Sequence, residues 1–291
     1  MITYNPKDWI SVIFRFHKTD TFRKLFWTIV MIGLYSTLVA IFEVEVLNIS
    51  QNNYVRNLTL LHNLLGFVLS LLLVFRTNTA YDRWWEGRKL WGSLVNNSRN
   101  LSIKIKSFVP NDTDTIHFYR RTIPLYAVML ARHLKTEKTR LALDEKEHPE
   151  LKHLDDEKHV PNQVALLMMQ RANRLYLEKK ITGDQLIVLN GELLSFTDVC
   201  GACERIRNTP IPFSYSVFLK KFILIYIITL PFGFVFSLGY YVIPAVCFIF
   251  YALASLELIA EEIEDPFGKD VNDLPTEKIA SNIRHHIEEI L

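Results

Sequence analysis

The chain has 291 residues and a formal net charge of +2, with 49% apolar and 22% charged residues. A mean hydropathy of +0.13 beside an ordinary charge content means that apolar and charged residues are segregated along the chain, which excludes a disordered protein. The near balance of 33 basic and 31 acidic residues disfavours a nucleic-acid-binding protein, and three cysteines are too few for a disulfide scaffold.

Three stretches that lack Asp, Glu, Lys and Arg predict membrane-spanning helices. Residues 25–42 and 57–75 make up 18 and 19 positions, close to the roughly 20 that cross a hydrocarbon core of about 30 Å. The third stretch, 222–256, has 35 residues and would form a helix of about 52 Å, too long for one crossing. Because Gly239 marks a place to turn, we expect two spans there. They are predicted near residues 218–236 and 241–259.

Basic residues precede the first span, follow the second and open the third, whereas the loop between the first two spans holds only Arg56 against two glutamates. By the positive-inside rule, both termini and the long middle segment are predicted to be cytoplasmic, in a multi-pass protein of the cell (inner) membrane. Helical spacing of apolar residues in the middle segment predicts a helical bundle, and the fold class is therefore all-α. The expected segments are 1–24 (cytoplasmic), 25–82 (membrane helices 1 and 2, with the pore helix at 57–82), 83–215 (cytoplasmic helices), 216–262 (membrane helices 3 and 4) and 263–291 (cytoplasmic).

The second span carries the most informative pattern. Phe67, Leu71 and Phe75 stand four residues apart, so they lie within an arc of about 80° on one helix face. Extending the row adds Asn63 and Thr59 before it, as an outer mouth. Rings of these side chains from several subunits would form an apolar constriction with polar mouths, which can gate a pore by dewetting. Ordinary packing or lipid contact is the alternative interpretation of the same spacing.

Four motifs resemble the signature of the prokaryotic bestrophin family. They are 75–92 (FRTNTAYDRWWEGRKLWG), 203–206 (CERI), 209–213 (TPIPF) and 261–268 (EEIEDPFG), in the family's order along the chain. The resemblance implies a homopentameric ion channel with four membrane helices per subunit and a large cytoplasmic helical part. It also implies a hydrophobic neck of three residues on the second helix, which by position are Phe67, Leu71 and Phe75.

The resemblance further implies a second constriction at the cytoplasmic exit, made by an apolar side chain. The matching region gives Asp184, Ile181 and Ile187 as candidates; a ring of Asp184 would favour cations, whereas a surface loop with a helix cap is the structural alternative. Eukaryotic bestrophins bind calcium after the fourth span, and Asp270 and Asp273 stand there in this chain. Lys269 among them weakens the case for calcium, so we expect no metal.

Carboxylates cluster where the fourth span ends and need partners near lipid, at Glu257, Glu261, Glu262, Glu264 and Asp265. Arg83, Arg205 and Arg207 are the candidates. Cys200 and Cys203 form a C-x-x-C pair with no second pair to complete a zinc site, so packing between helices is the favoured interpretation.

The sequence thus predicts a channel rather than an enzyme, without cofactor, in contact with lipid, copies of itself and monovalent ions. The prokaryotic resemblance favours cations, and an anion channel is the alternative. A membrane-embedded enzyme or carrier that uses the carboxylate cluster is a third hypothesis, which would require those carboxylates to converge with a histidine.

Overall fold

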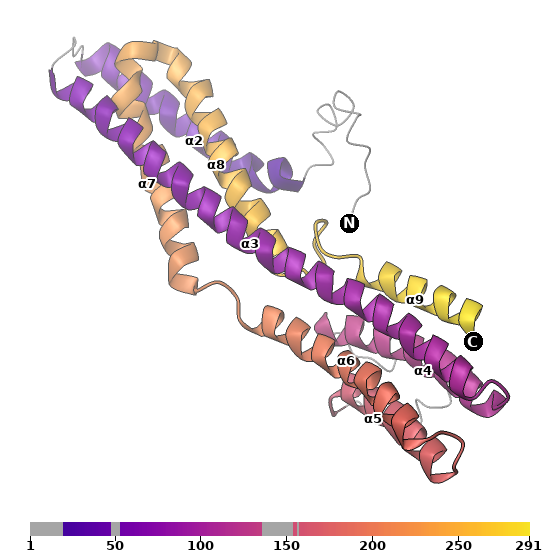
Figure 1. Ribbon diagram of the computed structural model, residues 1–291. Coiled ribbons are helices and arrows are strands. Elements are labelled where there is room, and N and C mark those ends of the chain that lie inside the picture. Colours follow the sequence, from indigo (N-terminus) through magenta and orange to yellow (C-terminus); the bar gives the residue numbers. More distant parts are fainter. Residues whose placement is uncertain (1–19, 48–52, 136–153, 156) are drawn as a thin grey trace. The chain divides into compact units, whose positions relative to one another are not determined.

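The computed structural model describes residues 20–47, 53–135, 154–155 and 157–291, with side-chain environments over 21–45, 58–135, 154–155 and 157–291. Every regular element in these ranges is a helix, as Figure 1 shows, which confirms the predicted all-α class. The elements are α2 (Asp20–Ile41), the π-helix η2 (Phe42–Leu47), α3 (Asn53–Phe108), α4 (Thr113–Leu134), α5 (Val160–Leu177), α6 (Gly183–Asn208), α7 (Phe213–Leu238), the 3-10 turn η5 (Gly239–Tyr241), α8 (Val242–Glu264) and α9 (Thr276–Ile290).

The chain divides into two compact units. One, here the apolar unit, takes its described residues from Ile2–Asp82 and Pro210–Glu264, and the other, here the polar unit, from Arg83–Thr209 and Asp265–Leu291. The boundaries at 82/83, 209/210 and 264/265 divide the chain by packing alone, so the assignment of segments to membrane and cytoplasm stays a prediction. α3 contributes residues to both units as one helix of 56 residues.

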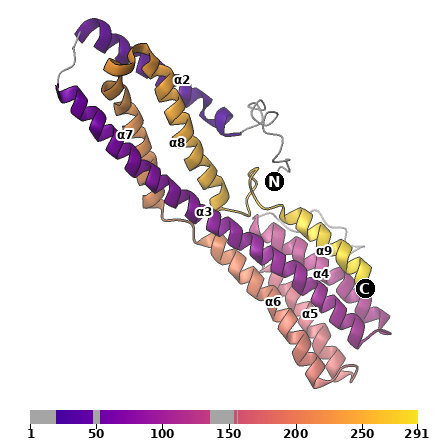
Figure 2. The ribbon, with the colours of Figure 1, turned by 45° about the horizontal axis from the view of Figure 1, so that its top comes forward.

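In the apolar unit, α2 packs against α7 and α8, and α7 packs against α8 (Figures 1 and 2). Leu69 and Leu73 of α3 join side chains of these helices in one buried cluster, together with Leu219, Ile223 and Ile227 of α7. The four spans predicted from the sequence correspond to α2, α3, α7 and α8, with only their end residues Phe42 and Tyr241 lying in η2 and η5.

The predicted turn between the last two spans lies at Gly239. Its backbone has φ +54° and ψ −137°, a conformation that only glycine adopts readily. α7 ends one residue earlier, and its last amide contact runs from Gly239 N–H to Val235 O. A residue with a Cβ would therefore be strained at this corner even though the space around it is open.

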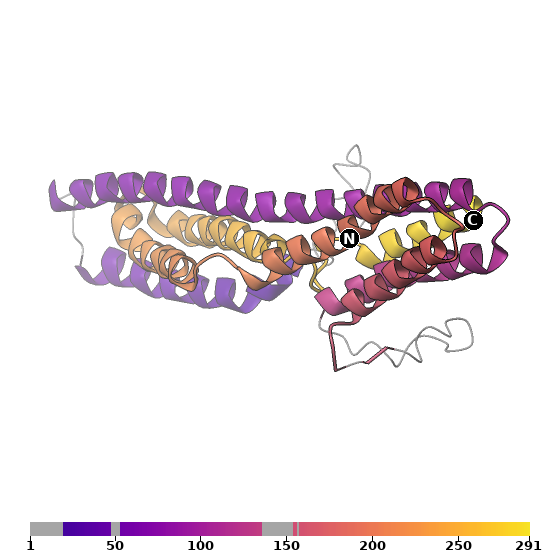
Figure 3. The ribbon, with the colours of Figure 1, turned by 60° about the horizontal axis from the view of Figure 1, so that its bottom comes forward.

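In the polar unit, α4 packs against α5 and α9, and α5 packs against α6 (Figure 3). The buried core of this unit includes Trp91, Tyr119, Tyr126 and Phe196. Two of its polar groups are satisfied by main-chain carbonyls: Tyr126 Oη donates to Phe196 O at 2.7 Å and Tyr119 Oη donates to Met168 O at 2.8 Å. Buried aromatic residues with satisfied hydroxyls tie α4 to α5 and α6.

By length and composition alone, the described residues contain four candidate membrane-spanning regions: Thr21–Glu45, Leu58–Phe108, Gly183–Asn208 and Phe213–Glu264. The last of these holds both α7 and α8, separated by the turn at Gly239. The third is α6, which the sequence did not predict as a span. Charged residues occur along α6 from Asp184 to Arg207, and its apolar side chains pack into the core of the polar unit, so we do not count it among the spans.

Candidate ion pathway and its supporting ion pairs

The apolar row on α3 lies on the outside of the single chain. Phe67, Leu71 and Phe75 are 68%, 46% and 57% exposed. On the opposite side of the same helix, Leu69 and Leu73 are buried in the apolar unit. One face of α3 therefore holds the unit together, whereas the predicted neck row is left exposed by the described residues around it.

Upstream of the row, the two predicted outer-mouth residues have different environments. Thr59 is half-buried, and its hydroxyl donates to Gly233 O of α7 at 2.8 Å. Asn63 is exposed. Between them, His62 is buried and contacts Thr229 Oγ1 at 3.0 Å and Leu58 O at 2.9 Å. Thr59 and His62 thus attach α3 to α7. Of the two outer-mouth candidates, Asn63 is the one with an exposed side chain.

A buried arginine directly follows the row. Arg76 is 1% exposed, and its Nη2 donates to Glu264 Oε2 at 2.6 Å. Its Nε lies 3.5 Å from Glu257 Oε2, an ion pair without a hydrogen bond. The other oxygen of Glu264 accepts from the Ile211 amide at 2.6 Å. These contacts join α3, the start of α7 and the end of α8 at one buried charge cluster.

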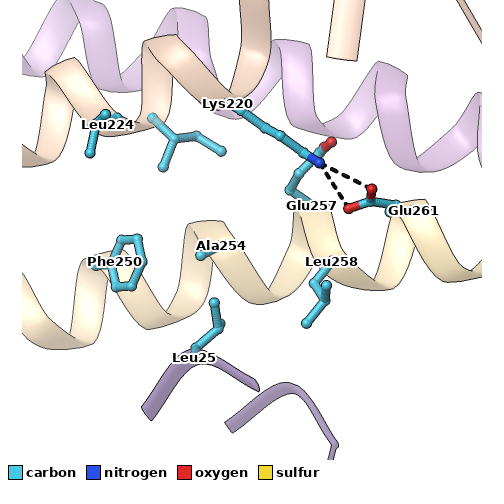
Figure 4. A pocket seen from close by; sticks show the side chains of 9 residues that line it. Leu25, Lys220, Leu224, Phe250, Ala254, Glu257, Leu258 and Glu261 are labelled. Carbon is cyan, nitrogen blue, oxygen red and sulfur yellow. Dashed lines mark hydrogen bonds and ion pairs between the residues drawn. The ribbon is translucent and has the colours of Figure 1, made fainter. Parts of the chain in front are cut away.

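Two further lysines neutralise the acidic end of α8. Lys220 Nζ lies 3.0 Å from both carboxylate oxygens of Glu261, and Lys24 Nζ lies 3.0 Å from Glu262 Oε1. A cavity of about 350 Å³ opens beside the Lys220–Glu261 pair. Figure 4 shows its charged end at Lys220, Glu257 and Glu261 and its apolar walls, which come from α2, α7 and α8.

The contacts shown for the three arginines predicted as partners lie in the polar unit. Arg83 donates to the carbonyls of Ile206 and Thr209, at 2.5 and 2.6 Å. Arg205 pairs with Glu86 at 2.6 Å, and Arg207 donates to His133 O at 2.9 Å. The sequence analysis missed Arg76, Lys220 and Lys24 as partners of the carboxylates. One signal was available, because Arg76 follows an uncharged span directly and an arginine at that depth needs a counter-ion.

The three exit candidates fall in the polar unit. Ile181 is 5% exposed and belongs to the core of that unit. Asp184 is exposed in the first turn of α6, and Ile187, one turn later, is 71% exposed. Thr182 caps this helix, since its hydroxyl accepts from Gln185 N and the Gln185 side chain accepts from Thr182 N. The helix cap considered from the sequence is thus present, and the two exposed candidates stand at its start.

The two calcium-clasp candidates lie in the loop between α8 and α9. Asp273 is 4% exposed, and its Oδ2 accepts from the Asp270 amide at 2.6 Å. Asp270 is exposed. The Asp273 side chain therefore closes the loop onto the backbone amide of Asp270. Among the described residues, these aspartates do not form part of a group of three metal-ligating side chains.

Cys200 and Cys203 are both free and buried in the core of the polar unit. Burial raises the pKa of the Cys200 thiol to about 12, so this thiol stays protonated and unreactive at neutral pH. This environment agrees with the packing role inferred from the sequence.

A helical bundle with several apolar helices, an exposed apolar row on one of them, and carboxylates that pair with basic side chains is an arrangement that fits a membrane channel. The comparisons with known proteins agree. The family model described as Bacterial/Fungal Bestrophin protein matches residues 1–289, and the chain belongs to that family. It is a bestrophin-family ion channel, as the motifs indicated.

Relatives from several bacteria are named as channels. A Voltage-dependent anion channel-forming protein of Nostoc sp. is 36% identical over 77% of this chain and 75% of its own length. Escherichia coli YneE, with the same descriptive name, is 33% identical over 76% of this chain and 73% of its own. A crystal structure of a mutated bacterial bestrophin homologue from Klebsiella pneumoniae superposes with a TM-score of 0.81 at 26% identity, and covers 92% of this chain and 98% of that one. The names of the relatives do not support the cation prediction and favour the anion alternative.

Proposed function

We propose that copies of this chain assemble as a homopentamer in the cell membrane and conduct monovalent anions through an axial pore, with Phe67, Leu71 and Phe75 as the neck. The neck assignment is supported by the exposed row on α3, since the opposite face of this helix packs against the apolar unit and holds the buried Arg76. The number five comes from the family resemblance, and the anion from the names of relatives such as the Nostoc protein.

The neck is an apolar segment about 12 Å long, since Phe67 and Phe75 are eight residues apart at 1.5 Å per residue. A narrow stretch of this length without polar groups loses its water readily, and widening it lets hydrated ions pass. Aromatic rings carry a positive edge and a negative face. Phe67 and Phe75 can thus support a chloride-sized anion when their edges line the opening, and their faces would support a cation instead.

Asn63 is proposed for the outer mouth, because Thr59 already donates to the main chain of α7. At the cytoplasmic exit we propose Ile187, which is apolar and 71% exposed, with Asp184 one turn away. Ile181 is unsuited to that role, since its side chain fills the core of the polar unit. An exposed Asp184 near an anion exit would slow anions. Removing its charge therefore tests whether Asp184 lies at the exit, because the anion current should then rise.

The proposed orientation puts both termini in the cytoplasm. It is supported by the basic residues before the first span and by Lys220 and Lys221 at the start of the third, against the acidic loop that follows the first span. A cysteine-accessibility experiment on intact cells, with single cysteines placed at Gln51 and at Lys278, tests it. Labelling by an impermeant reagent at Gln51 alone supports this topology, and labelling at Lys278 alone contradicts it.

Reversal potentials in planar bilayers test the ion sign. Under a tenfold KCl gradient, an ideally anion-selective pore reverses at about 59 mV with the sign of the chloride equilibrium potential. The opposite sign would refute the anion proposal. The double variant Leu71→Ala/Phe75→Ala is expected to raise the current, because it widens and wets the neck. Leu38→Ala is the matched control, since Leu38 is as exposed as Phe67 (69% against 68%) but lies on α2.

A further inference from the structure

Two histidines and one glutamate from three different helices meet in the polar unit. His133 lies in the last turn of α4, His159 is the N-cap residue of α5, and Glu204 lies on α6. The Nε2 atoms of His133 and His159 lie 2.6 and 2.7 Å from the same oxygen, Glu204 Oε1. The ring centroids of the two histidines are 4.4 Å apart, and both rings face the same carboxylate oxygen.

We propose that His133, His159 and Glu204 form a binding site for one divalent transition-metal ion of the Zn²⁺ type, which the channel function does not require. The ligand atoms of the three side chains all lie within 4.8 Å of one another. Around a tetrahedral zinc ion with bonds of about 2.0–2.2 Å, ligand atoms stand about 3.3 Å apart. The two short contacts to Glu204 need to open by less than about 1 Å to admit the ion.

The chemistry of the three ligands selects the class of ion. Two imidazole nitrogens with one carboxylate oxygen suit Zn²⁺ and its transition-metal neighbours better than Ca²⁺ or Mg²⁺, which prefer oxygen alone. The side chains of His133 and Glu204 are each 29% exposed and that of His159 is 31% exposed. A hydrated ion can therefore reach the site, and water can fill its fourth position.

The competing interpretation is a hydrogen-bonded clamp in which both histidines donate to Glu204. It has one structural argument in its favour: His159 Nδ1 accepts from the Asn162 amide at 3.2 Å as the cap of α5, and this leaves the ring proton on Nε2. A metal on Nε2 would move that proton to Nδ1 and end the cap bond. Because this bond is long and a single cap is weak compared with the coordination of a divalent ion, metal binding is the stronger interaction.

The buried thiols nearby give the proposal a spectroscopic signature. Cys200 and Cys203 stand on the same helix as Glu204 but point into the core, where each is at most 1% exposed. They do not belong to the group of ligand atoms around Glu204. The first coordination shell is thus predicted to contain nitrogen and oxygen and no sulfur, which distinguishes this site from one built on the C-x-x-C pair.

Zinc titration of the purified, EDTA-stripped full-length protein in detergent tests the proposal by calorimetry and by the thermal unfolding midpoint. We expect one Zn²⁺ per subunit, a higher midpoint, and an affinity at least about tenfold lower in His159→Asn and in Glu204→Gln. Asparagine is itself a favoured cap, so His159→Asn removes the ligand and keeps the start of α5. His285→Ala is the matched control, because His285 pairs with Glu289 on the exposed side of α9, and it should bind zinc like the wild type.

Three outcomes would overturn the proposal: no binding at micromolar zinc, unchanged binding in both His159→Asn and Glu204→Gln, or sulfur in the zinc X-ray absorption spectrum. A lower midpoint in the variants with no response of the wild type to zinc would also overturn it, in favour of the hydrogen-bonded clamp. None of these measurements depends on conduction, so they stand apart from the proposed channel function.

Discussion

The buried Arg76 offers a test of how burial decides the value of an ion pair, because the chain holds a second pair of the same length. Arg76 Nη2–Glu264 Oε2 and Arg205 Nη2–Glu86 Oε1 are both 2.6 Å long. The side chains of the first pair are 1% and 12% exposed, and those of the second are 67% and 41% exposed. The two pairs thus differ mainly in their access to water.

Removing Arg76 is predicted to be far more costly than removing Arg205. Arg76→Ala removes the positive charge that pairs with Glu264 and lies 3.5 Å from the buried Glu257, and removing one partner of a buried ion pair costs about 3–5 kcal/mol. Arg205→Ala breaks a surface pair worth less than about 1 kcal/mol. At about 2–4 °C per kcal/mol, the expected falls in the unfolding midpoint are about 6–20 °C and at most about 4 °C.

Gel filtration of detergent-solubilised protein after heating, followed by tryptophan fluorescence, measures the midpoint for the folded assembly. The triple variant Arg76→Met/Glu257→Gln/Glu264→Gln carries no buried charge at this place and should recover most of the loss. If Arg76→Ala does not fold, the unfolding midpoint of this triple variant still tests the assignment of Arg76. Equal midpoints for Arg76→Ala and Arg205→Ala, or no recovery in the triple variant, would refute the assignment of Arg76 as the counter-ion of these carboxylates.

Two other predictions concern the polar unit. Burial raises the pKa of Asp112, but hydrogen bonds from Lys180 and the Thr115 amide outweigh it and hold the pKa below the ordinary 3.8. Asp112→Ala should therefore cost about 1 kcal/mol of stability at pH 7, because a helix cap is lost. The stability difference between the wild type and Asp112→Asn measures the contribution of the ion pair with Lys180, and it should vanish as the pH falls through the lowered pKa. A gap between the wild type and Asp112→Asn that is the same in urea unfolding at pH 7 and at pH 3 would contradict this. Gly191→Ala should stabilise α6 by about 0.5–1 kcal/mol because no atom lies near the added Cβ, whereas Gly87→Ala should destabilise, since its Cβ would lie 3.1 Å from the Phe267 ring; opposite signs in one thermal-unfolding series are the expected result.

The membrane helices could be predicted from the sequence because the uncharged stretches of the chain determine where they lie. Uncharged stretches of the length of a span can satisfy their backbone groups in lipid only as helices, and a glycine with positive φ marks the turn between α7 and α8. The first residue of α7 was predicted five positions late. Pro212 precedes the helix as its N-cap residue, and hydropathy does not detect that boundary, because the first turns of α7 include Lys220 and Lys221.

The contacts between distant segments could not be predicted in the same way. Arg76 and Glu264 are 188 residues apart, and His133 and Glu204 are 71 apart. The sequence shows that carboxylates near lipid need a partner, yet it does not show which basic residue the packing brings to them. Ile181 illustrates the same limit, because its neighbours made it an exit candidate while its burial places it in the core.

The rotation of α3 connects the two findings in the apolar unit. The spacing of four predicts that Phe67, Leu71 and Phe75 share a face, but spacing does not say whether that face turns inward or outward. Arg76 stands nine residues after Phe67, half a turn around the helix at about 180°. The ion pair with Glu264 requires the Arg76 side of α3 to be buried. Phe67, on the opposite side of the helix, therefore faces outward, where a pore or a neighbouring subunit can contact its ring. Arg76→Ala is therefore expected to change conduction as well as stability, while Arg205→Ala, in the polar unit, should leave conduction unchanged and lower stability only slightly.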